Sequence, residues 1–216
     1  MLHLAARRHD GSLIVVGSAH RGTVGRVLAG DVTMGTLHGA ECPVMVAPHG
    51  FAVHGSDLGT LGVGFDGSPE SRAAAELARD LAIVAAAQLK VIRVLAPMPP
   101  GGPTLAYHED WAERDEERRE DAQAGLDALL AELGENATGE VVVGEPATEL
   151  AYAANELDLL VTGSRGYGPV RRLMLGSTST RLVREAPCPV LVLTRGAEAE
   201  PDAEHGGAGS VPAHTS

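Results

Sequence analysis

Apolar runs and amphipathic segments alternate along the chain from residue 59 onward. Short apolar runs are typical of buried strands, and apolar residues at helical spacing are typical of helices packed on a sheet. The expected strands are residues 59–65, 89–95, 140–143, 157–162 and 189–194. A helix is expected in each interval between them. This alternation predicts an α/β fold with an open, parallel, five-stranded sheet.

The longest expected helix spans residues 110–133 and is crowded with charge. Residues 113–120 read Glu-Arg-Asp-Glu-Glu-Arg-Arg-Glu, and opposite charges three or four positions apart pair along a helix surface. We therefore interpret this run as a solvent-exposed face and not as a pair of catalytic acids.

The first 50 residues carry the same pattern in a shorter form: a helix over 1–9, a strand over 12–16, a helix over 24–38 and a strand over 44–47. Gly17 and Gly163, Gly30 and Gly176, and Cys42 and Cys188 are each 146 residues apart. A constant offset predicts an internal duplication whose first copy lacks three strands. A truncated gene, a misplaced start codon and a real remnant all explain this half copy.

The expected organisation therefore has four parts. Residues 1–50 form a partial, degenerate repeat, 51–58 a linker and 59–196 a complete domain. Residues 197–216 contain almost no large apolar side chains and predict a disordered tail, because they bury too little surface to offset the cost of ordering.

Candidate chemistry lies after the apolar run 157–162. Gly163-Ser164-Arg165-Gly166 follows this strand, and after nine intervening residues Gly176-Ser177-Thr178 stands at the start of a helix. Glycine lets the main chain approach a ligand closely, and free N–H groups at a helix start favour an anion. The carboxyl ends of parallel strands are also where open α/β sheets bind ligands. The spacing therefore predicts a phosphate-binding site.

This spacing resembles the ATP-binding signature of the universal stress protein family. The resemblance covers about residues 59–195, and includes Asp66 after the first strand and the closing run Cys188-Pro189-Val190-Leu191-Val192-Leu193. It implies the adenine-nucleotide alpha hydrolase-like fold with strand order 3-2-1-4-5. It also implies bound ATP, with Mg²⁺ left open: adenine near Asp66 and Val94, and phosphates over Gly166, Gly176, Ser177 and Thr178. A role in stress response or signalling enters only through this resemblance.

Each of these residues also has a plain structural interpretation. Gly163 and Gly166 can serve only to turn the chain, and Gly176-Ser177 can be an ordinary helix cap. Asp66 before Gly-Ser-Pro can be a turn residue that leads into a helix. Nucleotide binding is favoured because all three features fall at carboxyl ends of expected parallel strands.

The composition of the chain restricts the kinds of molecule that we expect it to bind. The net charge of −12 disfavours nucleic acid and anionic membranes, so a nucleotide needs local positive charge, for which the motif offers Arg165, Arg171 and Arg172. No apolar stretch reaches the length of a membrane helix, and no signal peptide is evident, so we expect a cytoplasmic protein. Cys42 and Cys188 are expected as reduced, buried side chains, and no metal site is expected from the nine histidines.

The half copy departs from the motif at two positions. His20 stands where Gly166 stands in the full copy, and Asp31 stands where Ser177 does. A carboxylate repels a phosphate, so we expect no second nucleotide site. In the family the last strand is an edge that pairs antiparallel with another last strand. Its partner here is expected to be either a second molecule, giving a homodimer, or residues 44–47 of the same chain.

The sequence is compatible with several classes of function. Binding is expected instead of catalysis, because no segment supplies a recognisable base and Mg²⁺-holding set, although slow ATP hydrolysis stays open. The alternatives are a structural family member that binds no nucleotide, and a regulatory subunit. A related nucleotide-dependent enzyme such as an ATP pyrophosphatase is disfavoured, because residues 64–68 lack its Ser-Gly-Gly-rich loop.

Overall fold

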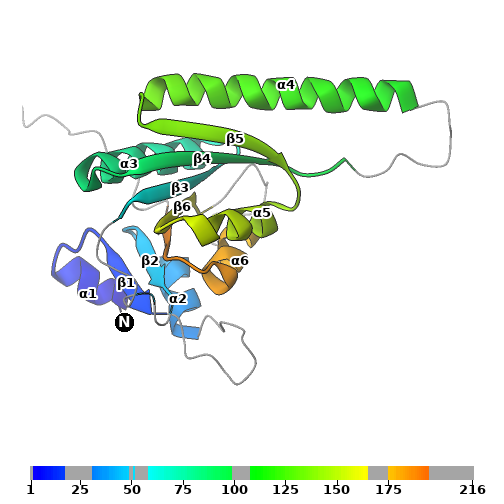
Figure 1. Cartoon of the computed structure of the whole chain (residues 1–216). Helices are drawn as coiled ribbons and strands as arrows, with labels where there is room; N and C mark the ends of the chain where they lie inside the picture. The colour runs from blue at the N-terminus through cyan, green and yellow to red at the C-terminus, as the bar shows by residue number, and fades with distance from the viewer. Residues whose placement is uncertain are drawn as a thin grey trace, which may run out of the picture.

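The protein forms one seven-stranded sheet with helices on both faces (Figure 1). The structure is a computed structural model, and it describes residues 2–17, 31–48, 51, 58–98, 108–164 and 175–194. The sheet order is β1-β2-β7-β6-β3-β4-β5. The strands are β1 (Ile14–Gly17), β2 (Val44–Ala47), β3 (Thr60–Phe65), β4 (Gln88–Leu95), β5 (Ala137–Val143), β6 (Leu159–Gly163) and β7 (Val190–Leu193).

Five of these strands confirm the expected domain. In chain order β3, β4, β5, β6 and β7 are mutually parallel and stand in the predicted order 3-2-1-4-5. The prediction of five strands in the sheet was incomplete, because β2 and β1 continue the same sheet beyond β7. The β5 strand also begins earlier than expected, at Ala137 instead of Glu140.

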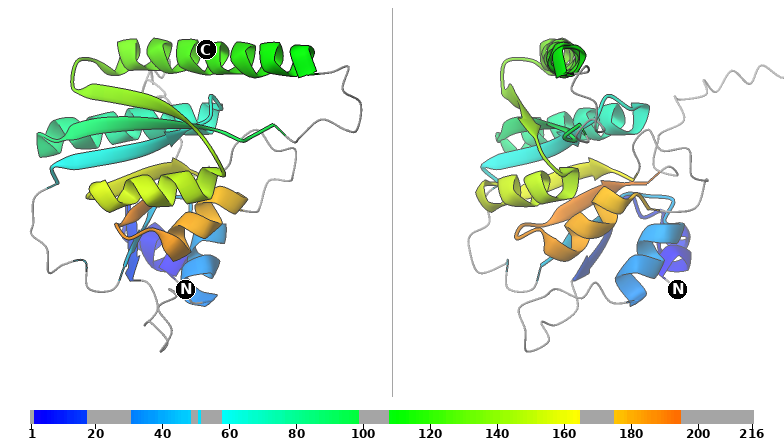
Figure 2. Two further views of the ribbon diagram at one scale, coloured as in Figure 1. Left: turned by 45° about the vertical axis from the view of Figure 1, so that its right-hand side comes forward. Right: turned by 90° about the vertical axis from the view of Figure 1, so that its right-hand side faces the viewer.

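Helices cover both faces of the sheet and enclose two apolar cores. Helices α3 (Pro69–Ala85) and α4 (His108–Leu133) pack on one face, where α4 lies along β5 (Figure 1). Helices α5 (Pro146–Ala153), which continues as the short 3₁₀ helix η3 (Ala154–Glu156), and α6 (Ser177–Glu185) lie side by side on the other face (Figure 2).

Two glycines of β3 let α5 and the residue that follows η3 pack closely on the sheet. A Cβ on Gly62 would lie 2.2 Å from a methyl carbon of Leu157, and one on Gly64 would lie 3.0 Å from a methyl carbon of Leu150. Leu157 and Leu150 are both buried. The glycines in this strand therefore serve core packing as well as backbone conformation.

The first residues of the chain add helix α1 (Leu2–Arg8) and helix α2 (Asp31–Gly39) to the two extra strands. These elements match the expected helix-strand-helix-strand succession, and β2 has the bounds that the sequence predicts. Part of the expected helix over 24–38 lies outside the described residues, as do residues 52–57 of the linker and the tail. The interpretation as a half repeat stays a prediction.

The last strand of the domain, β7, pairs antiparallel with β2 of the same chain. Val44 faces Val192 and Val46 faces Val190, and the Thr194 hydroxyl donates a 2.9 Å hydrogen bond to the Cys42 carbonyl. Of the two partners that the sequence allowed for this edge, the structure therefore shows the intramolecular one. The register also separates the cysteines, because Cys42 and Cys188 lie at opposite ends of this ladder, and both are free thiols. Cys188 is buried as expected, whereas Cys42 is only half-buried.

Candidate functional site

The predicted site residues lie at one level of the sheet, at the carboxyl ends of three neighbouring strands. Phe65 of β3 pairs with Arg93 of β4, so the next residues, Asp66 and Val94, are level with each other. The register between β3 and β6 continues in the same way and places Ser164 level with Asp66. The sheet thus brings together residues that are far apart in the sequence.

Hydrogen bonds hold the start of α6 against the end of β6. The Gly176 N–H donates a 2.7 Å bond to the Ser164 carbonyl, and the buried Ser179 hydroxyl donates a 2.7 Å bond to the Gly163 carbonyl. The Ser164 N–H in turn donates to the Leu193 carbonyl of β7 at 2.9 Å. The two halves of the glycine motif are therefore adjacent in space.

Among the described residues, the first turn of α6 has no side-chain cap. Its N-cap is Gly176, which brings no side chain to accept from the first N–H groups of the helix. In contrast, the Ser68 side chain caps α3 and the Glu145 side chain caps α5. The first N–H groups of a helix have no intrahelical acceptor and carry partial positive charge. Ser177 is exposed and Thr178 half-buried at this turn, so N–H and hydroxyl donors are available to an anion.

Gly163 also has a packing role. A Cβ at this position would lie 3.0 Å from the carbonyl oxygen and 3.1 Å from the carbonyl carbon of Glu70, in the first turn of α3. These are backbone atoms, which cannot move aside as a side chain can. The close approach of α3 therefore favours glycine here, whether or not a ligand binds.

Asp66 shapes the turn between β3 and α3. Its Oδ1 atom accepts a 2.9 Å hydrogen bond from the Ser68 N–H, and the intervening Gly67 has a φ of 86°. This is the turn role that the sequence allowed. The Asp66 residue is nevertheless exposed at the rim, so its carboxylate is accessible to a ligand.

Val94 lies on the face of the sheet that α5 and α6 cover. It is half-buried and packs against the apolar cluster of that face. The half-buried Val94 and the exposed Asp66 give this end of the sheet one apolar and one polar side chain at the same level. That combination suits a heterocyclic base with a hydroxylated sugar.

The cations of the motif loop, Arg165, Arg171 and Arg172, lie outside the described residues together with Gly166. Arg181 of α6 forms ion pairs with Glu145 at 2.6 Å and with Glu185 at 2.9 Å. Its charge is therefore already shared between two carboxylates.

Glu145 links α5 to α6 at the same edge of the sheet. Its pKa is lowered from the ordinary 4.5, chiefly because the Thr148 hydroxyl donates a hydrogen bond to it. Backbone N–H groups of Thr148 and Ala147 and the Arg181 guanidinium add to this effect, and partial burial opposes it. The carboxylate therefore stabilises the contact between the two helices.

The sequence analysis did not identify Ser179 and Glu70, both of which contact Gly163 in the site. Ser179 ties the α6 turn to β6, and Glu70 supplies the backbone that crowds Gly163. Both effects depend on tertiary contacts, and only the serine position in the first turn of α6 gave a signal. Among the described residues, no group of three or more metal-ligating side chains gathers, and no helix is long and apolar enough to cross a membrane.

Comparison with known proteins identifies the family. The model of the universal stress protein family matches residues 1–48 and 58–194. The chain belongs to the universal stress protein family. This universal stress protein is 35% identical over 195 residues to a relative from Mycolicibacterium smegmatis, covering 84% of this chain and 61% of the relative. It therefore spans about three fifths of that relative.

A shorter relative matches the complete domain. The chain is 37% identical over 138 residues to a universal stress protein from Thermus aquaticus, covering 62% of this chain and 97% of the relative. A solved structure of a putative universal stress protein from Pseudomonas aeruginosa has a TM-score of 0.69 at 17% identity, covering 90% of this chain and 67% of that chain. A universal stress protein from Archaeoglobus fulgidus gives 0.62 at 24% identity, with 90% and 66% covered. These structures share the fold.

Proposed function

We propose that this universal stress protein binds an adenine nucleotide, in the first place ATP, at the carboxyl ends of β3, β4 and β6. It acts as a binding protein in stress response or signalling. The observation that carries the proposal is the uncapped first turn of α6, held by Ser179 and Gly176 against the end of β6.

We place the nucleotide according to which site residues lie level with one another on neighbouring strands. Adenine lies near Asp66 and Val94, and the ribose lies toward Asp66 and Gly163. The phosphates lie over the α6 turn, where Gly176, Ser177 and Thr178 offer donors, and over the loop that begins at Ser164. Arg165 and Gly166 belong to this loop and complete the proposed phosphate site.

The proposed activity is binding without efficient turnover. Efficient hydrolysis needs a positioned water or base at the γ-phosphate and groups that hold Mg²⁺. Such a constellation is not assembled by the side chains that the structure describes around the α6 turn. Slow hydrolysis is compatible with the proposal, and Mg²⁺ would then accompany the nucleotide.

A second candidate is a family member that binds no nucleotide. Two observations favour it: Gly163 is needed for packing against Glu70, and Asp66 forms the turn before α3. Neither observation accounts for the absence of a side-chain cap at Gly176. Since the first N–H groups of a helix have no intrahelical acceptor, a ligand explains more of the site than a turn alone.

Calorimetric titration with ATP distinguishes the two candidates. The test variant is the double substitution Gly176→Asp and Ser177→Asp, which places two carboxylates at the proposed phosphate position. The matched control is Ala124→Asp with Ala128→Asp, which adds the same charge to exposed positions of α4. We expect saturable binding by the wild type and the control and none by the test variant. Absence of binding in all three proteins favours the structural candidate.

Self-association is a separate part of the proposal. A homodimer through β7 requires that β2 leave its place, because β2 already occupies that edge. We therefore propose that the intact chain does not dimerise through this strand. Light scattering after size exclusion is expected to give the mass of one chain; a dimer that persists at low concentration contradicts this.

A further inference from the structure

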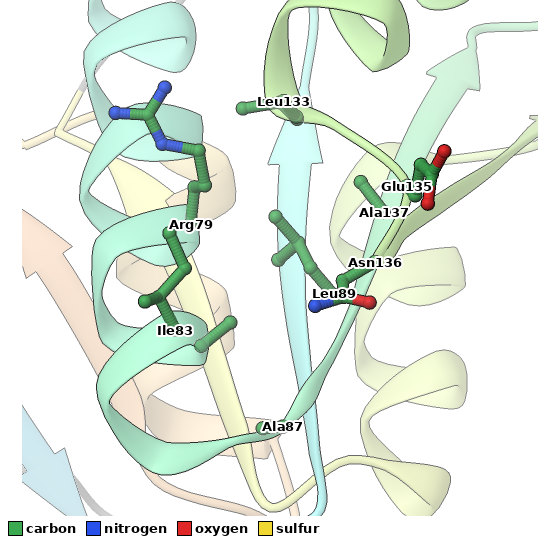
Figure 3. A pocket seen from close by; sticks show the side chains of 9 residues that line it. Arg79, Ile83, Ala87, Leu89, Leu133, Glu135, Asn136 and Ala137 are labelled. Atoms are coloured by element: carbon green, nitrogen blue, oxygen red, sulfur yellow. The ribbon is translucent and has the colours of Figure 1, made fainter.

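A pocket of about 320 Å³ lies at the end of the sheet opposite the proposed nucleotide site (Figure 3). It opens between the carboxyl ends of α3 and α4, over the first residues of β4 and β5. Its apolar lining includes the buried side chains of Ala82, Ala87, Leu89 and Leu133. The volume is in the range of small-molecule pockets, and the site is independent of the proposed nucleotide binding.

The charges around this pocket are unequal. Arg79 and Glu135 lie on opposite sides of it in Figure 3. The Arg79 guanidinium forms an exposed ion pair with Asp80 at 3.0 Å, so Asp80 offsets part of its charge. In the described part of the chain no cation forms an ion pair with Glu135, which is exposed at the rim.

The carboxyl ends of two helices add partial negative charge around the pocket. Helix α3 ends at Ala85 and α4 at Leu133, and neither has a basic residue in its last turn. The carboxyl end of a helix carries partial negative charge, which a nearby cation stabilises. Two such ends, the Arg79 guanidinium and the Glu135 carboxylate, which is unpaired among the described residues, therefore surround an apolar floor.

The apolar wall of the pocket reaches the surface through Ile83. This side chain is 65% exposed on α3, next to the pocket that it lines. Covering an exposed apolar side chain of this size lowers the free energy, so Ile83 is available to contact the apolar part of a ligand. The Asn136 side chain, on the other wall, adds an amide that can accept a hydrogen bond from an ammonium group (Figure 3).

We propose that this pocket binds a small organic cation: an ammonium group on a short apolar body. The ammonium lies toward Glu135 and Asn136, and the apolar body lies over Leu89 between Ile83 and Leu133. No residue of the proposed nucleotide site takes part.

Amide NMR spectra of the full chain test this with three probes of matched shape: benzylammonium, benzyl alcohol and benzoate. We expect saturable shifts of the Leu89, Asn136 and Ala137 amides with benzylammonium, weaker ones with the alcohol and none with benzoate. Glu135→Gln is expected to weaken benzylammonium binding about fivefold, the effect of a partly exposed ion pair. Glu120→Gln, which removes a carboxylate from an exposed position of α4 away from the pocket lining, serves as the control and leaves binding unchanged.

A second variant keeps the test independent of Glu135. Ile83→Lys changes an exposed position, so folding is retained, and it places a cation at the pocket mouth. Benzylammonium binding is expected to fall at least as much as in Glu135→Gln. Equal binding of the three probes, no shifts at these amides, or the same loss in Glu120→Gln would overturn the proposal.

Discussion

The Ser179 hydroxyl donates a 2.7 Å hydrogen bond to the Gly163 carbonyl, and both groups are buried. This bond joins the first turn of α6 to the last residue of β6. It sets the position of the uncapped N–H groups relative to the sheet. The geometry of the proposed phosphate site therefore depends on a side chain that faces away from the ligand.

Removal of this hydroxyl should lower both stability and affinity. Ser179→Ala leaves the buried Gly163 carbonyl with one donor fewer, and we expect a loss of about 1 kcal/mol in the free energy of unfolding. Urea denaturation measures this loss, and ATP titration measures the weaker binding that should accompany it. Ser177→Ala, at an exposed position of the same turn, should weaken ATP binding and leave stability unchanged. Equal stability losses in the two variants would contradict this division of roles.

Gly163 and Gly17 provide a matched pair of substitutions. Gly163→Ala places a Cβ 3.0 Å from the Glu70 carbonyl oxygen, so α3 must shift, and we expect a loss of about 1–3 kcal/mol in the free energy of unfolding. Gly17 is its counterpart in the predicted repeat, 146 residues earlier in the chain, and a Cβ there meets nothing within 4 Å. Gly17→Ala should change stability by no more than about 0.5 kcal/mol. Similar losses for both substitutions would refute the packing role of Gly163.

The Glu145 contact predicts a specific pH dependence. Because its pKa is lowered in the folded protein, its stabilising contribution is complete above the unfolded value of 4.5 and is lost as the pH falls through the folded pKa. Glu145→Gln should therefore be less stable than the wild type at neutral pH. The difference should shrink at acid pH, as measured by urea denaturation across the pH range. A difference that stays constant over that range would argue against the ionised contact.

Cys188 should be protected from alkylation in the native protein. Burial raises the pKa of its thiol to about 12, and the thiolate is the reactive form. Brief treatment with iodoacetamide at neutral pH, followed by peptide mass spectrometry, should label the half-buried Cys42 ahead of Cys188. Both should react after unfolding. Rapid labelling of Cys188 in the native protein would mean that the segment just before β7 opens readily.

The fold could be predicted from the sequence because its strands are short apolar runs separated by Pro and Gly. The same features locate Asp66, Val94 and Ser164, since residues that follow parallel strands meet at one edge of the sheet. The pairing of β7 could not be decided in this way. An exposed edge accepts any suitable strand, so the choice of residues 44–47 depends on how the first 50 residues fold back.

Other features depend on contacts between residues distant in the sequence. The roles of Gly62 and Gly64 under Leu157 and Leu150 follow from how closely α5 and the end of η3 approach β3. The Ser179 bond depends on the position of α6 relative to β6. The pocket between α3 and α4 has no motif at all, because it forms where two helices end near each other.

The most direct test of nucleotide binding is mass spectrometry of the small molecules released when the protein, purified without added nucleotide, is denatured. The wild type should release ATP or another adenine nucleotide, and the Gly176→Asp, Ser177→Asp variant should release none. The two proteins must first show the same circular dichroism, so that a loss reflects the site and not the fold. A wild-type protein that releases no nucleotide and also fails to bind added ATP would contradict the proposed function.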